Sequence, residues 1–296
     1  MIRQKCALCQ KDDFRILYKA NFDIKQIDEK IFSARRLPDR LHYRIVQCRK
    51  CRVVYSNPIL DHTILEKLYK KSVLDYDEHI ANLQKTYGFY LRKLEKFAVR
   101  KSRILEIGCG NGFFLEEARA QGYKEVYGVE PSMQAVSKAS SYLKKRIKID
   151  IFRHGLYARQ FFDVICCFQT LDHLPDPNAV LRECFFVLKK GGLVLFLNHD
   201  VESLSARLLK NRSPIIDIEH TYLFSKKTMR QLFEKHGFQV LAVENSFNFH
   251  NISYWVRLFP FPNWLKLRLI DMIKMLKLDA FPLKLYPGNL VLFGRK

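Results

Sequence analysis

Two short apolar runs each end in an acidic residue, and this pairing is the part of the sequence best suited to chemistry. The run Arg103–Ile107 carries Glu106, and the run Val126–Val129 is followed by Glu130. Directly after the first run stand Gly108, Gly110 and Gly112. Glycines let the backbone turn tightly and approach a ligand closely, and Glu130 is able to accept hydrogen bonds from two ribose hydroxyls. The pattern predicts a nucleotide-type site at the carboxyl ends of adjacent parallel strands.

The spacing of these glycines distinguishes the site from one that binds a dinucleotide. Dinucleotide folds use G-x-G-x-x-G and place a pyrophosphate at a helix N-terminus, whereas Phe113 stands here in the place of the third glycine. The run E-x-G-x-G-x-G followed by a strand-end acid resembles the class I S-adenosylmethionine (SAM)-dependent methyltransferases. Glu106 stands just before the turn, where an acid is able to receive the amino group of a zwitterionic ligand.

The resemblance implies a set of SAM-binding residues along the strand ends. Asp150 follows the third expected strand, where many family members hold the adenine amino group, and Phe168 and Gln169 are expected to face the sulfonium. Tyr76 matches a family segment and either lines the SAM pocket or packs in the core. The predicted cofactor-binding residues are Glu106, Gly108, Cys109, Gly110, Gly112, Glu130, Pro131, Asp150, Phe168, Gln169 and Tyr76.

His173 is the candidate catalytic residue. It lies in a segment that resembles the family's E-H-L-x-D-P run, with Asp172 in place of the usual glutamate. An imidazole is able to take a proton from an acceptor hydroxyl; the alternative is that His173 hydrogen-bonds the backbone and only shapes its loop. A second segment, H-x-Y-x-F-S, places His220 and Tyr222 either against a substrate or in the packing of a lid.

Two C-x-x-C pairs near the N-terminus predict a zinc ribbon. Zinc favours four thiolates in a tetrahedron, and a closed set of four cysteines leaves no open position for catalysis. The predicted ligands of a structural Zn2+ are Cys6, Cys9, Cys48 and Cys51. The alternative is a degenerate ribbon with free thiols. The long gap between the pairs is expected to hold a hairpin around Phe32 to Arg44.

The elements that position these residues alternate in type from 103 to about 246. This order predicts an α/β fold with a doubly wound, mostly parallel seven-stranded sheet, Rossmann-like, preceded by a small N-terminal zinc ribbon. Expected strands cover 103–107, 126–129, 146–149, 162–168, 193–198 after a Gly191–Gly192 turn, and an antiparallel 289–293, and expected helices include 113–121 and 132–143. The predicted units are a ribbon at 1–60, linking helices at 61–101 and a methyltransferase domain at 102–296 with a basic amphipathic insertion at 247–286.

The formal net charge of +21 favours an acidic partner. An anionic membrane surface is one candidate, contacted through 254–278, where tryptophans adjoin a basic amphipathic helix; a substrate lid or a dimer face are the alternatives. Nucleic acid is a second choice, because ribbons either bind nucleic acid or merely cap a domain. The N-terminus MIRQKCALCQ has no apolar h-region, so we expect a cytoplasmic protein, peripheral at the inner membrane surface if the helix binds there.

Together these patterns predict a SAM-dependent methyltransferase that acts on a small-molecule acceptor, such as a sugar, a glycan intermediate or another metabolite. The N-terminal half is similar to the zinc-ribbon sugar C-methyltransferases, although the additional C-terminal domain associated with those enzymes is missing. The alternative is an RNA methyltransferase that uses the basic ribbon. A non-catalytic SAM-fold binding protein is the third hypothesis, which the intact glycines and Glu130 disfavour.

Overall fold

The computed structural model describes residues 1–22, 41–72, 80–259, 261–280 and 282–296. Tyr76 lies outside the described residues, and so does most of the hairpin expected around Phe32 to Arg44. Within the described ranges, no helix combines the length and apolar character that crossing a membrane requires.

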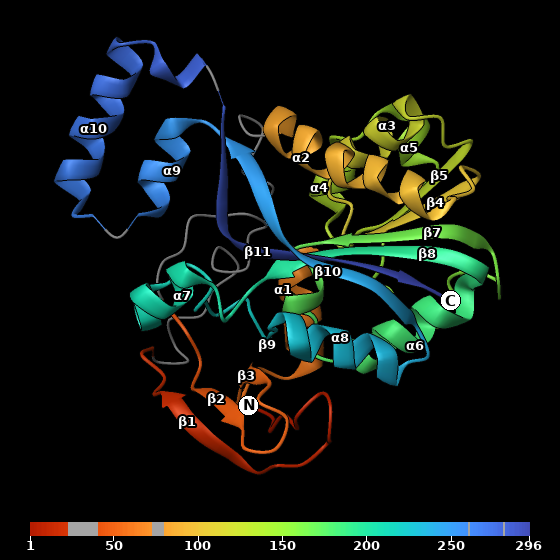
Figure 1. The fold of residues 1–296 in the computed structure, drawn as a ribbon, viewed down its shortest axis with the longest axis horizontal. Coiled ribbons are helices and arrows are strands. Elements are labelled where there is room, and N and C mark those ends of the chain that lie inside the picture. Colours follow the sequence, from red (N-terminus) through yellow and green to blue (C-terminus); the bar gives the residue numbers. More distant parts are fainter. Residues whose placement is uncertain (23–40, 73–79, 260, 281) are drawn as a thin grey trace.

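A seven-stranded sheet forms the centre of the molecule, in the order β10-β11-β8-β7-β4-β5-β6 (Figure 1). Its strands are β4 Arg103–Ile107, β5 Glu125–Val129, β6 Ile147–Lys148, β7 Phe162–Phe168, β8 Leu188–His199, β10 Gln239–His250 and β11 Leu283–Arg295. The pairs among β4, β5, β6, β7 and β8 are parallel, and β11 pairs antiparallel with both β8 and β10. The predicted fold class is therefore confirmed, including the antiparallel insertion of the last strand.

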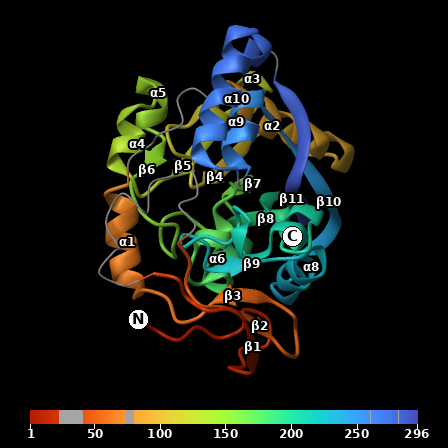
Figure 2. The same ribbon diagram turned by 90° about the vertical axis from the view of Figure 1, so that its left-hand side faces the viewer.

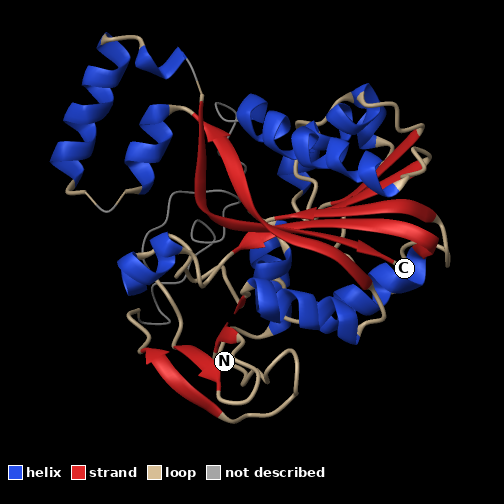
Figure 3. Cartoon of the chain, viewed as in Figure 1, coloured by secondary structure: helices blue, strands red, loops and turns tan. Residues whose placement is uncertain are grey.

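Helices cover both faces of this sheet, because side chains along a buried strand alternate between two cores. On β7, Val164 and Cys166 face one apolar cluster, whereas Ile165 and Cys167 face the other. The first cluster is closed by α2 Ile80–Lys93, α3 Phe113–Ala120 and α4 Met133–Ser137, and the second by α6 Pro177–Val187 and α8 Lys226–Lys235 (Figure 3).

Side-chain caps start several of the helices. Asp61 caps α1 His62–Lys70, Ser132 caps α4, and Ser225 with Thr228 forms a capping box at α8. Each cap satisfies a backbone N–H that has no partner inside the helix. The remaining short helices are α5 Ser141–Lys144, α7 Leu204–Leu209 and the 3-10 turns Leu94–Phe97, Leu171–His173, Lys210–Arg212 and Leu278–Ala280.

Three expected elements differ from the structure. The last strand, expected over 289–293, already begins at Leu283, inside the insertion expected at 247–286. The helix expected over 132–143 is broken, because Ser140 accepts a hydrogen bond from the Leu143 N–H and starts a separate helix, α5. The turn expected at Gly191–Gly192 lies inside β8, which already begins at Leu188. The pairing of β7 with β8 shifts register there, so the two glycines form an irregularity within one strand and do not end the preceding element.

The N-terminal segment forms its own small antiparallel sheet, in the order β1-β2-β3-β9. Its first three strands are β1 Phe14–Tyr18, β2 Ile45–Cys48 and β3 Val54–Ser56, while β9 Tyr222–Leu223 comes from the long segment before α8. Tyr55 stacks on Tyr222 with ring centroids 5.8 Å apart. Residues of both units therefore share one apolar cluster, and the N-terminal sheet packs as an extension of the α6 and α8 side.

The insertion between β10 and β11 forms two helices, α9 Ile252–Leu258 and α10 Asn263–Met275. They stand beyond the ends of the two strands, at the opposite end of the molecule from β1 (Figures 1 and 2). The apolar stripe expected along α10 is only partly covered: Ile273 is buried, but Met272 and Leu276 are exposed. The helix therefore presents apolar surface that the described chain leaves uncovered.

Candidate functional site

The glycine run forms a tight turn between β4 and α3. Gly108 and Gly112 have φ values of +73° and +81°, in the left-handed region that other residues rarely adopt. A Cβ on Gly108 would lie 2.5 Å from Thr170 Oγ1, and one on Gly112 would lie 2.6 Å from Leu143 Cδ1. The turn is thus restricted to glycine both by its backbone geometry and by its close neighbours.

The Glu130 side chain links the ends of β4 and β5. One carboxylate oxygen accepts a hydrogen bond from Gly110 N–H at 2.8 Å, and the other accepts one from Ser132 N–H at 2.9 Å. Burial raises the pKa of the Glu130 carboxyl above its usual range, and the two backbone donors oppose that rise. The carboxylate therefore holds the glycine turn of β4 against the start of α4.

A cavity of about 590 Å³ opens at the carboxyl edge of the sheet, within the size range of small-ligand sites. Of the predicted residues, those that line it are Glu106, Gly108, Gly110, Glu130, Pro131, Asp150, Phe168, Gln169 and His173. Cys109 and Gly112 do not line it: the Cys109 sulfur packs under Gly128, and Gly112 caps α3. Ligand binding by any of these residues stays a prediction.

Asp150 and Phe168 have partners that bear on their expected roles. Asp150 forms an ion pair with Arg153 at 2.7 Å, and this contact lowers the pKa of its carboxyl. The Asp150 side chain remains at the cavity wall as a hydrogen-bond acceptor. Phe168 stacks on Tyr87 of α2, with centroids 4.1 Å apart and ring planes 7° apart. The stack holds the end of β7 against the helix that covers it.

Gln169 takes a strained backbone conformation where β7 ends. Its φ of +48° is unusual for a residue with a side chain. The conformation is held by its own N–H, which donates to Leu197 O at 2.7 Å, and by Tyr87 Oη, which donates to Gln169 Oε1 at 3.3 Å. Such strain is concentrated at binding sites, which fits the placement of Gln169 on the cavity wall.

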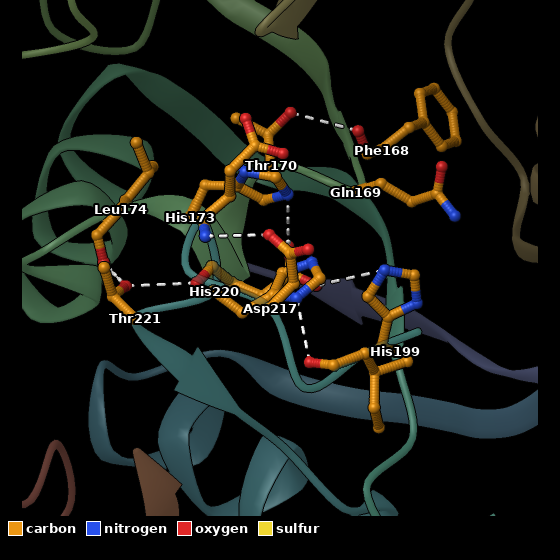
Figure 4. Close-up of polar contacts among 12 residues, drawn as sticks. Phe168, Gln169, Thr170, His173, Leu174, His199, Asp217, His220 and Thr221 are labelled. Atoms are coloured by element: carbon orange, nitrogen blue, oxygen red, sulfur yellow. Dashed lines mark hydrogen bonds and ion pairs between the residues drawn. The ribbon is translucent and has the colours of Figure 1, made fainter. Parts of the chain in front are cut away.

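Three histidines meet at one side of the cavity (Figure 4). His173 lies on the 3-10 turn after β7, His199 ends β8, and His220 precedes β9. The ring centroid of His220 lies 4.8 Å from that of His173 and 4.8 Å from that of His199. Sequence reasoning singled out His173 and His220 but missed His199, whose only local signal is its place at the carboxyl end of a parallel strand.

His220 faces this cavity, whereas Tyr222 does not line it. His220 Nδ1 donates to the Ile215 carbonyl at 2.9 Å, and burial lowers the pKa of this imidazole well below its usual range. Tyr222 Oη donates to Lys5 O at 2.8 Å, toward the N-terminal unit. Of the two alternatives for this segment, contact with a ligand fits the position of His220, whereas packing fits that of Tyr222.

Two polar side chains lie near His173, one on the adjoining residue and one on the distant helix α1. His173 Nδ1 lies 3.4 Å from Tyr69 Oη of α1, and its Nε2 lies 3.9 Å from Asp172 Oδ1. Tyr69 lines the same cavity, as do Asp217 and Glu219. Neither acid was predicted as a site residue, because the segment 213–221 has no secondary-structure period to place it over the sheet edge.

The four N-terminal cysteines come together as predicted. The sulfur atoms of Cys6, Cys9, Cys48 and Cys51 all lie within 4.8 Å of one another, and Cys9 and Cys48 are 3.7 Å apart. Tetrahedral zinc with bonds of about 2.3 Å places its sulfurs about 3.8 Å apart. Cys51 N–H also donates to Cys48 Sγ at 3.3 Å. All four ligands are thiolates, so the set fits a closed zinc site.

Comparison with known proteins places the chain in a family. Residues 78–243, more than half of the chain, match the methyltransferase domain family Methyltransf_23. The chain belongs to this family, which confirms the class predicted from the glycine run and the strand-end acid.

Relatives and solved structures agree with this placement. A ubiquinone biosynthesis O-methyltransferase of Ralstonia nicotianae is 36 % identical over 100 residues, which cover 32 % of this chain and 42 % of that protein. The same-named protein of Idiomarina loihiensis is 37 % identical over 109 residues, covering 34 % and 44 %. The chain thus spans less than half the length of these relatives.

Among solved structures, a protein of Bacillus halodurans that is assigned as a methyltransferase aligns with a TM-score of 0.51 and 18 % identity. The alignment covers 70 % of this chain and 98 % of that one. At this identity the likeness concerns the fold alone, and it agrees with the Rossmann-like sheet described above.

Proposed function

We propose that the protein is a SAM-dependent methyltransferase that acts on a small-molecule acceptor. The observation that carries the proposal is the convergence of the glycine turn, Glu106 and Glu130 on one cavity. Glu130 would hold the ribose, Glu106 the amino group of the methionine part and Asp150 the adenine. When bound, SAM supplies a methyl group that is already activated, so the protein has mainly to align the acceptor and exclude water.

The same cavity extends from the turn to the histidines, which would face the acceptor. His173 is the proposed general base, because an imidazole at the cavity wall is able to take the proton of an acceptor hydroxyl as the methyl arrives. Tyr69 would orient that imidazole through its hydroxyl. A hydroxyl acceptor agrees with the relatives, which are named as O-methyltransferases. The sugar and glycan acceptors predicted from the ribbon remain candidates within this class.

Calorimetric titration with SAM and with S-adenosylhomocysteine tests the binding step. We expect saturable heat for both, and no heat with either compound would contradict the proposal and favour a non-catalytic scaffold. The acceptor is then sought by supplying labelled SAM to a small-molecule extract and to an RNA fraction. Label in RNA, together with binding that falls steeply with salt, would favour the RNA methyltransferase, the alternative suggested by the net charge and the basic ribbon.

We propose that the four-cysteine cluster binds a structural Zn2+. The site couples Cys6 and Cys9 to the knuckle that follows β2, and these segments share the apolar cluster with α6 and α8. Zinc would therefore stabilise the attachment of the N-terminal sheet to the methyltransferase domain. With this site we propose the division of the chain into a ribbon at 1–60, linking helices at 61–101 and a methyltransferase domain at 102–296.

A third proposal concerns α10, which would contact an anionic membrane surface. Its exposed large apolar side chains include Trp264 at 61 %, Leu267 at 64 % and Met275 at 75 %, and lysines such as Lys274 stand among them. Apolar residues bordered by lysines favour an interfacial helix. Flotation with vesicles of anionic lipid tests this: we expect binding that a Trp264→Ser substitution weakens, and absence of flotation would contradict it.

A further inference from the structure

A second metal site emerges from the histidine cluster. We propose that Asp172, His199 and His220 bind one divalent transition-metal ion at the cavity wall, separate from the four-cysteine site. Their ligand atoms all lie within 4.8 Å of one another, and His199 Nε2 lies 4.0 Å from Asp172 Oδ2. Metal–ligand bonds of about 2.0–2.2 Å place ligand atoms about 3–4 Å apart. Small side-chain movements would therefore close the three residues on an ion.

The environment of the Asp172 carboxylate favours a bound cation. Asp172 is 1 % exposed, and neither of its carboxylate oxygens has a hydrogen-bond partner among the described residues. The nearest imidazole nitrogens, on His173 and His199, are 3.9 Å and 4.0 Å away, beyond hydrogen-bond distance. Burying an ionised carboxylate without a partner costs free energy. A metal ion between Asp172 and the imidazoles would supply the partner that the described residues do not provide.

Both histidine rings are already oriented as ligands. His220 Nδ1 must donate to the Ile215 carbonyl, because a carbonyl only accepts, and this leaves the lone pair on Nε2. His199 Nδ1 lies 2.8 Å from Asn289 Oδ1, an acceptor, which leaves its Nε2 for a metal in the same way. Metal-binding histidines are commonly fixed by such a hydrogen bond from the opposite ring nitrogen.

The backbone holds the carboxylate and one imidazole in register. Thr221 N–H and Oγ1 both donate to the Asp172 carbonyl, at 2.8 Å and 3.0 Å. Because Thr221 adjoins His220, these bonds tie the two ligand-bearing segments together. His199 lies at the end of the neighbouring strand β8, so the three ligands come from three segments: the turn after β7, the end of β8 and the segment before β9.

The donor set selects the kind of ion. Two imidazoles and one carboxylate suit Zn2+, Fe2+, Co2+ or Ni2+ better than Mg2+ or Ca2+, which prefer all-oxygen ligands. Three protein ligands leave at least one coordination position open, and His199 and His220 line the cavity. An ion there would hold an acceptor oxygen beside His173. This last role rests on the proposed function, whereas the metal site itself does not.

Cobalt titration of the protein loaded with a single equivalent of zinc tests the site, because the four thiolates bind that first zinc and leave Asp172, His199 and His220 available to cobalt. We expect one further equivalent of Co2+ with the visible absorption of nitrogen and oxygen ligands and without the charge-transfer band of cobalt thiolate. Asp172→Asn and His199→Asn should each weaken this binding roughly tenfold or more. The control is His154→Asn, whose imidazole is 78 % exposed and distant in sequence from the cluster.

No further Co2+ equivalent, only thiolate bands, or binding that both cluster variants leave unchanged would overturn the proposal. If Asp172→Asn does not fold, the Co2+ affinity of His199→Asn tests the proposal, since Asn preserves a polar side chain beside Asn289. The titration is performed without SAM, and SAM binding is measured separately. Loss of SAM binding alone would therefore contradict the proposed function and leave the metal site standing.

Discussion

The carboxylate of Glu130 accepts a hydrogen bond from the backbone N–H of Gly110 across two strand ends, at 2.8 Å. The bond places an acid from β5 directly against the glycine turn that follows β4. It fixes the shape of the turn and keeps the carboxylate at the cavity wall, so one residue serves both the architecture and the proposed SAM site.

Replacing Glu130 by Gln should weaken SAM binding about tenfold, because a neutral amide gives up the charge-assisted bonds proposed for the ribose. Stability should also fall, since one backbone N–H would meet an amide NH2 in place of an acceptor. Calorimetry and thermal unfolding measure the two effects. Glu125→Gln is the matched control: it neutralises a glutamate at the other end of β5, where Glu125 pairs with Arg103. Equal effects of both substitutions would remove Glu130 from the site.

Gly108→Ala should abolish detectable SAM binding. The new Cβ meets Thr170 Oγ1 at 2.5 Å, and the positive φ adds roughly 1–2 kcal/mol of strain. Gly155→Ala separates these causes, because Gly155 also has a positive φ, +90°, but its Cβ would have no neighbour within 4 Å. Gly155→Ala should therefore lower the unfolding temperature modestly and leave the SAM affinity unchanged. Normal SAM binding by Gly108→Ala would contradict the assigned turn.

Cys48→Ser should release the proposed zinc and lower the unfolding temperature by several degrees, at roughly 2–4 °C per kcal/mol lost. Chelation of zinc from the unmodified protein should have the same effect. Cys184→Ser is the control, because Cys184 is a buried cysteine of α6 outside the cluster. The Cys184→Ser variant should lose some packing energy but keep its zinc, and elemental analysis measures the zinc content. A full zinc content in Cys48→Ser would rule out the four-thiolate site.

His173→Asn should slow methyl transfer by roughly 10²–10⁴ while the SAM affinity stays the same, as expected for loss of a general base. Asn retains a polar group for Tyr69, so loop geometry should change little. His236→Asn, a histidine bonded to Asn178 away from the cavity, provides the control. A rate close to that of the unmodified protein would leave His173 with a role in loop shape alone.

Much of the fold follows from local patterns. The apolar runs at 103–107 and 162–168 coincide with β4 and β7 to the residue, because fully buried parallel strands need short continuous apolar segments. Ser132 and Ser225 cap their helices through bonds to residues three positions away. The C-x-x-C pairs likewise predicted that the four cysteines come together, since thiolate pairs in tight turns are typical of zinc sites.

The sequence by itself determined the order of strands and helices, the glycine turn, the strand-end acids and the two cysteine pairs, since each depends on neighbours a few residues apart. Only the tertiary structure decided that β9 completes the N-terminal sheet and that His199 and His220 converge on Asp172. These contacts join segments far apart in the chain: the parallel strands β7 and β8 bring Asp172 and His199 to one edge of the sheet, and the pairing of β9 with β3 holds the segment of His220 beside them. No local sequence periodicity predicts which residues will come together in this way.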